Sequence, residues 1–489
     1  MRWLCSIVLL LAALTVAAGP TIPPGDLALR HDIQRLADYK IIKGTVTTWP
    51  LAWGPIMADI RAFETASDLP PDVQDALARV RARGGWETTT GELRYRARVA
   101  AAENPSLIRS FQDTPREEGE ISAGLSWTGN WLSLDLNGIA VSDASDGEEY
   151  RPDGSHVAVA FGNWTVAAST LDRWWGPSWD GGLILSSNAR PFPTISMDRT
   201  FTDAFKNKWL RWIGPWDLSI HFGELESDRA VPNAQVFAMR VAFRPIPSLE
   251  IGLSRSAQWC GDNRPCDFDT FVDLFLGRDN VGDAGIGTDN EPGNQLAGVD
   301  FRWSKMVLSV PLAFYGQFIG EDEAGGFPSR YIGQVGLEGT GFARDKWSYR
   351  WFAEFTSTSC DFWKTDVIFD CAYEHVIYAD GYRYRGRPIG HAADNDARIA
   401  TLGMVFLDTG ENTWQGYIRS GELNRGGSVN NSNSVTRLPR DVTNIEIVHL
   451  RGFSFGRLEF GLGYDYFGGN NVESSSKDVR AFIQWRTDR

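Results

Sequence analysis

The chain has 489 residues, with 62 acidic and 48 basic side chains and a formal net charge of -14. Because nucleic-acid binding depends on clustered Lys and Arg, this balance argues against a nucleic-acid partner. The mean hydropathy is -0.26, and beyond the first residues no apolar run is long enough for a membrane-spanning helix. Aromatic residues make up 12% of the chain and include 20 Trp, which is typical of the aromatic girdles of membrane-spanning barrels.

The first 18 residues predict a cleaved signal peptide. Arg2 supplies the basic start, residues 4–16 form an apolar stretch, and small residues at 16–18 form a cleavage site before Gly19. The stretch is shorter than the roughly 20 apolar residues that span a bilayer, so a membrane anchor is the weaker interpretation. We therefore expect an exported protein that loses Cys5 with the signal.

Residues 19–90 predict a small helical module. Apolar residues recur at helical spacing in three groups: Leu29, Ile33, Leu36 and Ala37; Ile56, Ile60 and Phe63; and Val73, Leu77 and Val80, which follow Pro70 and Pro71. Three short helices bury little core on their own. We expect the module to pack as a plug on the periplasmic mouth of a larger domain, with a free periplasmic domain as the alternative.

Residues 91–489 predict an all-β transmembrane barrel of about eighteen antiparallel strands. Apolar and polar side chains alternate in segments such as 131–139, 215–222, 236–244, 347–355 and 457–466. The last such segment, 478–486, places Val479, Ala481, Ile483 and Trp485 on the outer face. A soluble propeller would leave rows this apolar unexplained.

The connections between these segments alternate in length. Short ones are expected at 128–130, 162–163, 245–247, 304–305 and 452–456, and long ones at 142–154, 260–293, 318–329, 359–395 and 421–443. Outer-membrane barrels have short periplasmic turns and long extracellular loops. The pattern therefore predicts a monomer in the bacterial outer membrane, surrounded by lipid and lipopolysaccharide, with the helical module in the periplasm.

Four cysteines remain after signal removal, in two pairs that are close in sequence. Cys260 and Cys266 lie in one long loop, and Cys360 and Cys371 lie in another. Among the three possible connectivities, the local one is favoured in an oxidising compartment. Neither pair has the C-x2-C spacing of a zinc site, so we expect disulfides and no metal.

Several motifs resemble those of the Wzi-type capsule-assembly outer-membrane proteins. They are LRHDIQ at 29–34 with WPL at 49–51, DRWWGP at 172–177, SNARPFP at 187–193, YGQ at 315–317 with GEDEAG at 320–325, and GYRYRGRPIG at 381–390. The resemblance implies an eighteen-strand barrel closed at its base by helices. It also implies a surface lectin that tethers capsular polysaccharide to the cell, with no enzyme activity and no cofactor.

Two segments combine the aromatic and planar polar groups that sugar recognition needs. The glycan-binding candidates are Arg173, Trp174, Trp175, Trp179 and Asp180 in one predicted extracellular loop, and Arg383, Arg385 and Arg387 in another. The alternatives are that the Trp residues pack inward or form a girdle, and that the Arg residues neutralise carboxylates in the lumen. The acidic run at 320–323 could hold Ca²⁺, although such runs are more commonly solvated.

Two other functions remain open at this point. An outer-membrane hydrolase needs Ser, His and a carboxylate together, and none of the six His accompanies a G-x-S-x-G motif. A barrel of this size could also form a solute channel, plugged or open. We expect a plugged lumen rather than an open porin.

Overall fold

The protein is described here from a computed structural model covering residues 21–488, apart from 64–68, 278–290, 292, 325–326, 344–345, 411, 428 and 471. The predicted signal peptide and its Cys5 lie outside the described residues. Among the residues that are described, no helix is long and apolar enough to cross a membrane.

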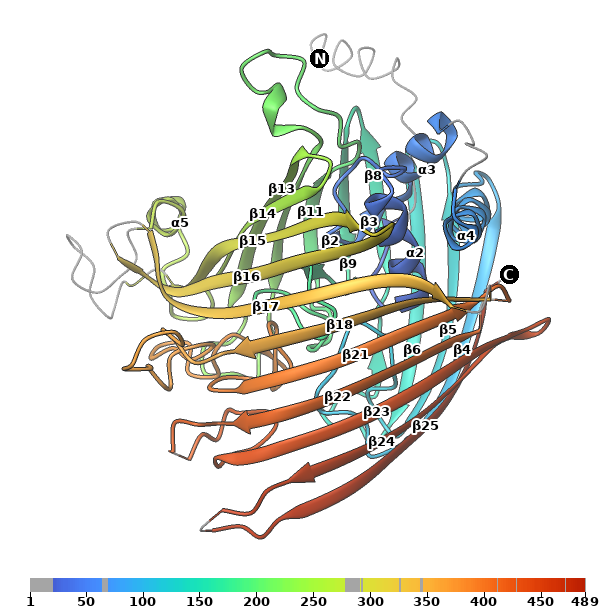
Figure 1. Ribbon diagram of the computed structural model, residues 1–489. Helices are drawn as coiled ribbons and strands as arrows, with labels where there is room; N and C mark the ends of the chain where they lie inside the picture. Colours follow the sequence, from blue (N-terminus) through green and yellow to red (C-terminus); the bar gives the residue numbers. More distant parts are fainter. Residues whose placement is uncertain are drawn as a thin grey trace.

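Eighteen antiparallel strands close into one barrel (Figure 1), which confirms the predicted fold class. They are β4 (Leu93–Glu103), β5 (Gly119–Thr128), β6 (Leu132–Ser142), β8 (His156–Phe161), β9 (Trp164–Ser169), β11 (Thr194–Arg199), β12 (Trp216–Glu224), β13 (Gln235–Ile246), β14 (Leu249–Trp259), β15 (Gly293–Val307), β16 (Val310–Ala324), β17 (Phe327–Ala343), β18 (Trp347–Ser357), β21 (Arg398–Asp408), β22 (Thr413–Leu423), β23 (Arg440–Phe453), β24 (Gly456–Phe467) and β25 (Ser476–Asp488). The last strand closes the wall on the first, with Asp488 opposite Arg96. A two-residue strand, β7 (Tyr150–Arg151), adds to β6.

The alternation along the strands separates the two faces of the wall. On β24 and β25 the paired Leu462 and Ala481 share the outer face, whereas the inward Arg480 is buried and bonds Asp465 and Glu446. Outer-face residues Leu462 and Val479 expose 67% and 65% of their surface. Such rows are stable only against hydrocarbon, because large apolar patches are rare on soluble proteins.

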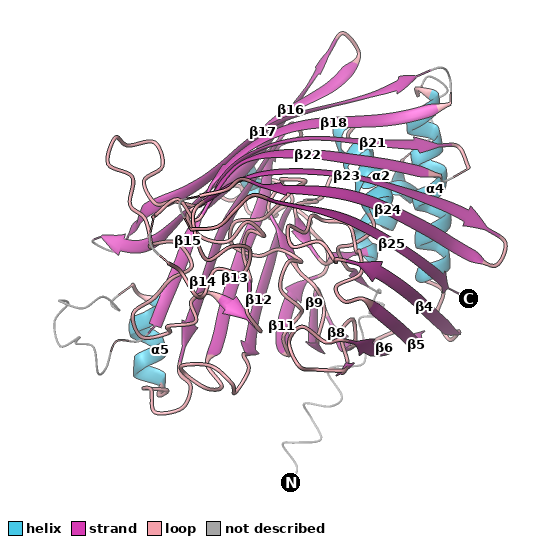
Figure 2. Ribbon diagram, turned by 90° about the horizontal axis from the view of Figure 1, so that it is seen from below, coloured by secondary structure: helices cyan, strands magenta, loops and turns pink. Residues whose placement is uncertain are grey.

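Three helices lie at one end of the barrel and inside it (Figures 1 and 2). They are α2 (Leu27–Asp38), α3 (Trp53–Ala62) and α4 (Pro71–Glu87), with the short strands β1 (Thr21–Ile22), β2 (Thr48–Trp49) and β3 (Leu51–Ala52) around them. Asp26 caps α2 by accepting a bond from the Leu29 amide, and Pro71 begins α4 at a position where proline is favoured. These are the three predicted helices. We call this end, which carries the short hairpin turns, the helix end, and the opposite one the loop end.

The loop end carries the long connections, several of which turn into the lumen (Figure 2). Both predicted disulfides, Cys260–Cys266 and Cys360–Cys371, lie in these connections. The connection between β14 and β15 also contains α5 (Phe268–Phe275), and the one between β18 and β21 contains the hairpin of β19 (Arg383–Tyr384) and β20 (Arg387–Pro388).

Two predicted connections are wrong. The segment 318–329 is mostly strand, because β16 and β17 continue pairing as far as Ala324 and Phe327. The expected turn at 304–305 is also strand, and the chain reverses at Leu308 and Ser309, which both adopt positive φ angles. That geometry belongs to a tight two-residue hairpin turn.

Buried ion pairs join the helices to the barrel wall. Arg302 of β15 bonds Asp38 of α2 at 2.6 Å and Glu338 of β17 at 2.5 Å, and all three side chains are almost fully buried. Arg350 of β18 bonds the second oxygen of Glu338 at 2.6 Å. Breaking a buried pair on one side leaves an uncompensated charge, which is far more costly than losing an exposed pair.

We expect Arg302→Met to weaken the attachment of α2 by about 3–5 kcal/mol, because buried Asp38 would lose its cation and Glu338 would lose one of its two. Hydrogen exchange should then increase in α2 while the barrel strands remain protected. As a control, Arg398→Met breaks the exposed Arg398–Glu422 pair and should cost about 1 kcal/mol or less. Equal effects of the two variants would contradict this assignment.

Candidate functional site

The connection 170–193 between β9 and β11 enters the lumen and meets the helical module. Its short strand β10 (Trp174–Trp175) pairs antiparallel with β2, so that Trp174 lies opposite Trp49 and Trp175 opposite Thr48. Phe111 packs edge-on against both Trp49 at 5.0 Å and Trp174 at 5.3 Å. A loop from one end of the barrel and helices from the other therefore share one apolar core.

The same connection buries the other candidates that it carries. The indole of Trp179 donates to Glu338 at 2.6 Å and lies between the guanidinium groups of Arg30 and Arg350, at 4.2 and 4.6 Å from its ring. Asp180 accepts from Arg419 at 2.8 Å. Arg173 is buried beside His221 and Asp198.

The glycan-binding candidates at 173–180 are therefore buried and do not form part of the outer surface. The inward packing weighed as the alternative is what the structure has, because the helical module offers the Trp side chains an apolar surface that a solvated loop would lack. Arg383 is also buried, between Glu374 and Asp394. Of the eight candidates, Arg385 and Arg387 are the two that stay partly accessible.

Arg385 and Arg387 line a cavity of about 450 Å³ at the loop end, which we call the mouth pocket. Five arginines from three separate connections converge on it, together with Tyr384: Arg109, Arg116, Arg190, Arg385 and Arg387. Arg190 is neutralised by Asp146 and by Asp153, which it bonds at 2.8 Å, and Arg385 is paired with Glu148 at 2.9 Å.

Two of these arginines bond neutral acceptors instead of carboxylates. Arg387 donates to the Leu107 carbonyl at 2.6 Å and the Asn188 side chain at 2.8 Å. Arg109 donates to the carbonyls of Thr114 and Pro115. Burial and the neighbouring Arg116 lower the pKa of Arg387 to about 10 and that of Arg109 to about 9. Both groups are therefore cationic at neutral pH. Four acidic residues also line the mouth pocket: Glu117, Glu118, Asp143 and Asp146.

Sequence reasoning found Arg385 and Arg387 but missed Arg109, Arg116 and Arg190. Arg190 lies within the SNARPFP motif, which could have indicated it. Arg109 and Arg116 lie in the irregular segment between β4 and β5, where no periodic pattern distinguishes them. Only the folded loops bring these residues together.

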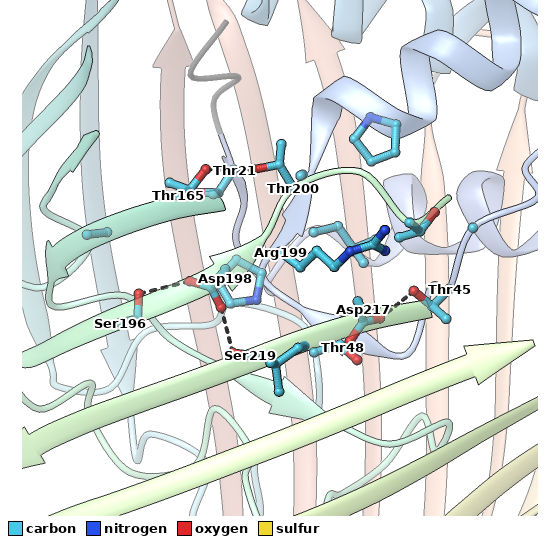
Figure 3. Close-up of a pocket in the computed structure, with 18 of the residues that line it drawn as sticks. Thr21, Thr45, Thr48, Thr165, Ser196, Asp198, Arg199, Thr200, Asp217 and Ser219 are labelled. Atoms are coloured by element: carbon cyan, nitrogen blue, oxygen red, sulfur yellow. Dashed lines mark hydrogen bonds between the residues drawn. The ribbon is translucent and has the colours of Figure 1, made fainter. Parts of the chain in front are cut away.

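A smaller cavity lies at the helix end between the helices and strands β9, β11 and β12 (Figure 3). Its volume is about 70 Å³. Asp198 accepts bonds from Ser196 at 2.9 Å and Ser219 at 2.6 Å, and Thr45 bonds Asp217 across it. A cavity of this size and polarity suits several water molecules and is too small for a sugar chain. Nowhere in the described chain do three His, Cys, Asp or Glu side chains gather as they would around a metal ion.

The apolar outer wall, the filled lumen and the open pocket at the loop end define an outer-membrane β-barrel with a ligand-sized site on its outer side. The family model described as capsule assembly protein Wzi matches residues 90–486. The chain belongs to the Wzi capsule assembly protein family, which confirms the resemblance seen in its motifs.

Two relatives show how close the match is. A Klebsiella pneumoniae protein, described as an uncharacterized 55.8 kDa protein in the cps region, is 34% identical over 352 residues, covering 71% of this chain and 67% of its own length. The solved structure of Escherichia coli Wzi, described as a carbohydrate-binding β-barrel involved in group 1 capsule assembly, is 27% identical. It matches 96% of this chain and 99% of its own, with a TM-score of 0.82.

The loops around the mouth pocket contain a carboxyl group suited to a pH test. Asp396 is fully buried, and one of its oxygens accepts from the Asp370 amide at 2.8 Å. Burial, together with the nearby Asp370 and Glu374 carboxylates, raises the pKa of Asp396 to about 7. The folded state therefore holds a proton at pH 6 that the unfolded loop, with an ordinary Asp, has already lost.

We expect the loop at 359–397 to lose about 1 kcal/mol of stability between pH 6 and pH 8, because the folded carboxyl becomes charged in that window. Hydrogen exchange of this loop, corrected for the intrinsic pH dependence, measures the loss. Asp396→Asn should flatten the dependence without disturbing the backbone, whose φ of 53° asparagine also tolerates. Unchanged pH dependence in the variant would contradict the assignment to Asp396.

Proposed function

We propose that this protein is a non-catalytic surface lectin that holds capsular or exopolysaccharide to the outer membrane, and that the polymer binds at the mouth pocket. The observation that carries the proposal is the convergence of five arginines and a tyrosine on one open cavity at the loop end. The carbohydrate binding described for Escherichia coli Wzi supports it. The non-catalytic role agrees with the description of that relative as a carbohydrate-binding barrel.

The chemistry of the pocket suits a polar, extended ligand. Guanidinium groups present several donors in one plane, which match pairs of sugar hydroxyls or a carboxylate. Arg109 and Arg387 keep net positive charge available because they are bonded to neutral groups. Their own bonds also hold them in place, so little side-chain entropy is lost when a ligand binds.

The buried candidates support the site without touching the ligand. Trp174 and Trp175 fix the connection 170–193 in the lumen, and that connection includes Asn188. The side-chain oxygen of Asn188 accepts a hydrogen bond from Arg387, and its backbone carbonyl accepts one from Arg116. Each contact with a sugar is weak, so retention of a long polymer depends on many repeats engaging many barrels.

We expect Arg385→Gln/Arg387→Gln to lower the apparent affinity for the host's own polymer by about tenfold, because two charge-assisted contacts are lost. Binding of the purified, detergent-solubilised protein to immobilised polymer measures this change. The control is Lys364→Gln/Arg398→Gln, which removes the same charge from the same end of the barrel outside the mouth pocket.

Similar losses in both variants would show that bulk charge, and not the pocket, attracts the polymer.

In cells, removal of the protein should release polymer into the medium while synthesis continues. A deletion strain that keeps its cell-bound polysaccharide would refute the lectin proposal.

One observation favours a channel as the second candidate. A cavity of about 250 Å³ lies between α4 and the wall formed by β4, β5 and β6, and it runs from Arg83 and Asp488 at the helix end to Arg116 and Arg151 near the loop end. Arg116 lines both this cavity and the mouth pocket. The Arg116 guanidinium is held where the two cavities meet, because it donates to the Ser187 and Asn188 carbonyls at 2.8 and 2.7 Å.

We expect the intact protein to show no steady conductance in planar bilayers, because helices and inward loops occupy the lumen. Deletion of residues 21–90 should produce open-channel currents if the remaining barrel still shows a heat-dependent shift on SDS gels. Porin-like conductance of the intact protein would favour the channel over the lectin.

A further inference from the structure

The connection between β11 and β12, residues 200–215, is an exception at the helix end. Most other strands meet there in short turns, whereas this connection is long and includes a 3-10 turn at Arg211–Ile213. It projects beyond the barrel rim in Figure 1, in green near the N label. Its outer part, residues 203–215, contributes no side chain to the lining of the helix-end cavity or of the mouth pocket.

This connection folds against the lipid-facing side of the wall. Phe205 stacks on Trp216 with ring centres 4.7 Å apart, and Trp212 meets Phe243 edge-on at 6.5 Å. Trp216 and Phe243 are paired across β12 and β13, while their neighbours Asp217 and Arg244 are buried toward the lumen. The alternation of the strands therefore places both aromatic partners on the face that meets hydrocarbon.

The backbone holds the connection in this position. Arg199 donates to the Asp203 carbonyl at 3.0 Å, and the Trp216 amide donates to the Thr202 carbonyl at 2.9 Å. Gly214 has a φ of 72°, and a Cβ atom there would lie 1.9 Å from the Arg244 carbonyl. Glycine is thus required for the chain to return to β12, and the outward path of the connection is part of the fold.

The free surface of this segment combines large apolar side chains with cations. Trp209 and Trp212 expose 75% and 62% of their surface, and Leu210 exposes 40%. Lys206, Lys208 and Arg211 are exposed beside them. Asp203 is the one acidic residue at this end of the segment, since the sequence has none from 204 to 216. In the described part of the chain none of these three cations has an ion-pair partner.

We infer that residues 203–214 form a platform that seats in the periplasmic leaflet of the outer membrane and binds the phosphate of anionic phospholipid. Tryptophan side chains favour the interface between hydrocarbon and water, and Lys and Arg beside them are attracted to anionic headgroups. The aromatic contacts with Trp216 and Phe243 place the platform where the lipid-facing wall ends. A protein partner is the competing occupant, and the experiments below separate the two.

The first experiment measures lipid preference. The whole protein is reconstituted in nanodiscs containing equal amounts of phosphatidylglycerol and phosphatidylcholine, and co-purifying lipid is counted by native mass spectrometry. We expect the wild type to retain phosphatidylglycerol preferentially, and Lys206→Gln/Lys208→Gln/Arg211→Gln to lower that preference about tenfold, because each cation near the surface attracts anionic lipid.

The matched control is Lys305→Gln/Lys346→Gln/Arg451→Gln, which removes three exposed cations from other helix-end hairpins. It should keep the preference of the wild type. Polymer binding at the mouth pocket should be unchanged in both variants, so the result is independent of the lectin proposal. An unchanged preference in the platform variant, or an equal loss in the control, would overturn the inference.

The second experiment measures depth. A fluorescent nitrobenzoxadiazole group attached to Ala204→Cys, at an exposed position of the platform, should be quenched by phospholipid that carries a spin label near its headgroup. Trp209→Ala/Trp212→Ala should reduce the quenching while the heat-dependent shift on SDS gels shows an intact barrel. A fully water-exposed reporter in the wild type would overturn the inference and favour a periplasmic protein as the occupant.

Discussion

The buried ionic network between the helices and the barrel wall is the constraint on which the rest of the structure depends. Arg302 and Arg350 share Glu338 on the wall, and Arg302 also holds Asp38 of α2. Ions this deep are tolerated only when their hydrogen-bonding capacity is used. Within this network Glu338 also accepts a hydrogen bond from the indole N–H of Trp179. The same few charged groups therefore hold the helices, the barrel wall and the inward connection 170–193 together.

This constraint explains why the aromatic connection 170–193 is buried in the lumen, whereas the arginines of the mouth pocket lie near the surface. The connection 170–193 follows the helices into the lumen and pairs with β2, so its Trp side chains are used in packing. The carbonyls of Ser187, Asn188 and Ala189 then face outward and are held by Arg116. The mouth pocket rests on that segment, and its cations converge because the lumen beneath it is filled.

The outer face of the barrel contacts lipid hydrocarbon instead of water. Lipid-facing rows need only be apolar, and the two ends of the wall add groups that tolerate both water and hydrocarbon. The folded-back segment 203–214 at the helix end and α5 at the loop end both lie against outward-facing aromatic residues of β12 and β13. Inside, the protein is organised by charge pairing, and outside by the position of the membrane boundary.

By itself the sequence determined the strand alternation, the three helices, the local disulfides and the family, because each depends on neighbours within a few residues or on a motif. It named Arg385 and Arg387 among the candidates, left open whether the Trp residues at 173–180 pack inward, and predicted a loop at 318–329. Only the tertiary structure decided those points, and only it brought Arg109, Arg116 and Arg190 to the same pocket. The physical reason is that a barrel has two environments for every loop, the lumen and the water outside, and local pattern cannot choose between them. That choice depends on whether the N-terminal module, far earlier in the chain, presents an apolar surface, as Trp49 of β2 does to Trp174.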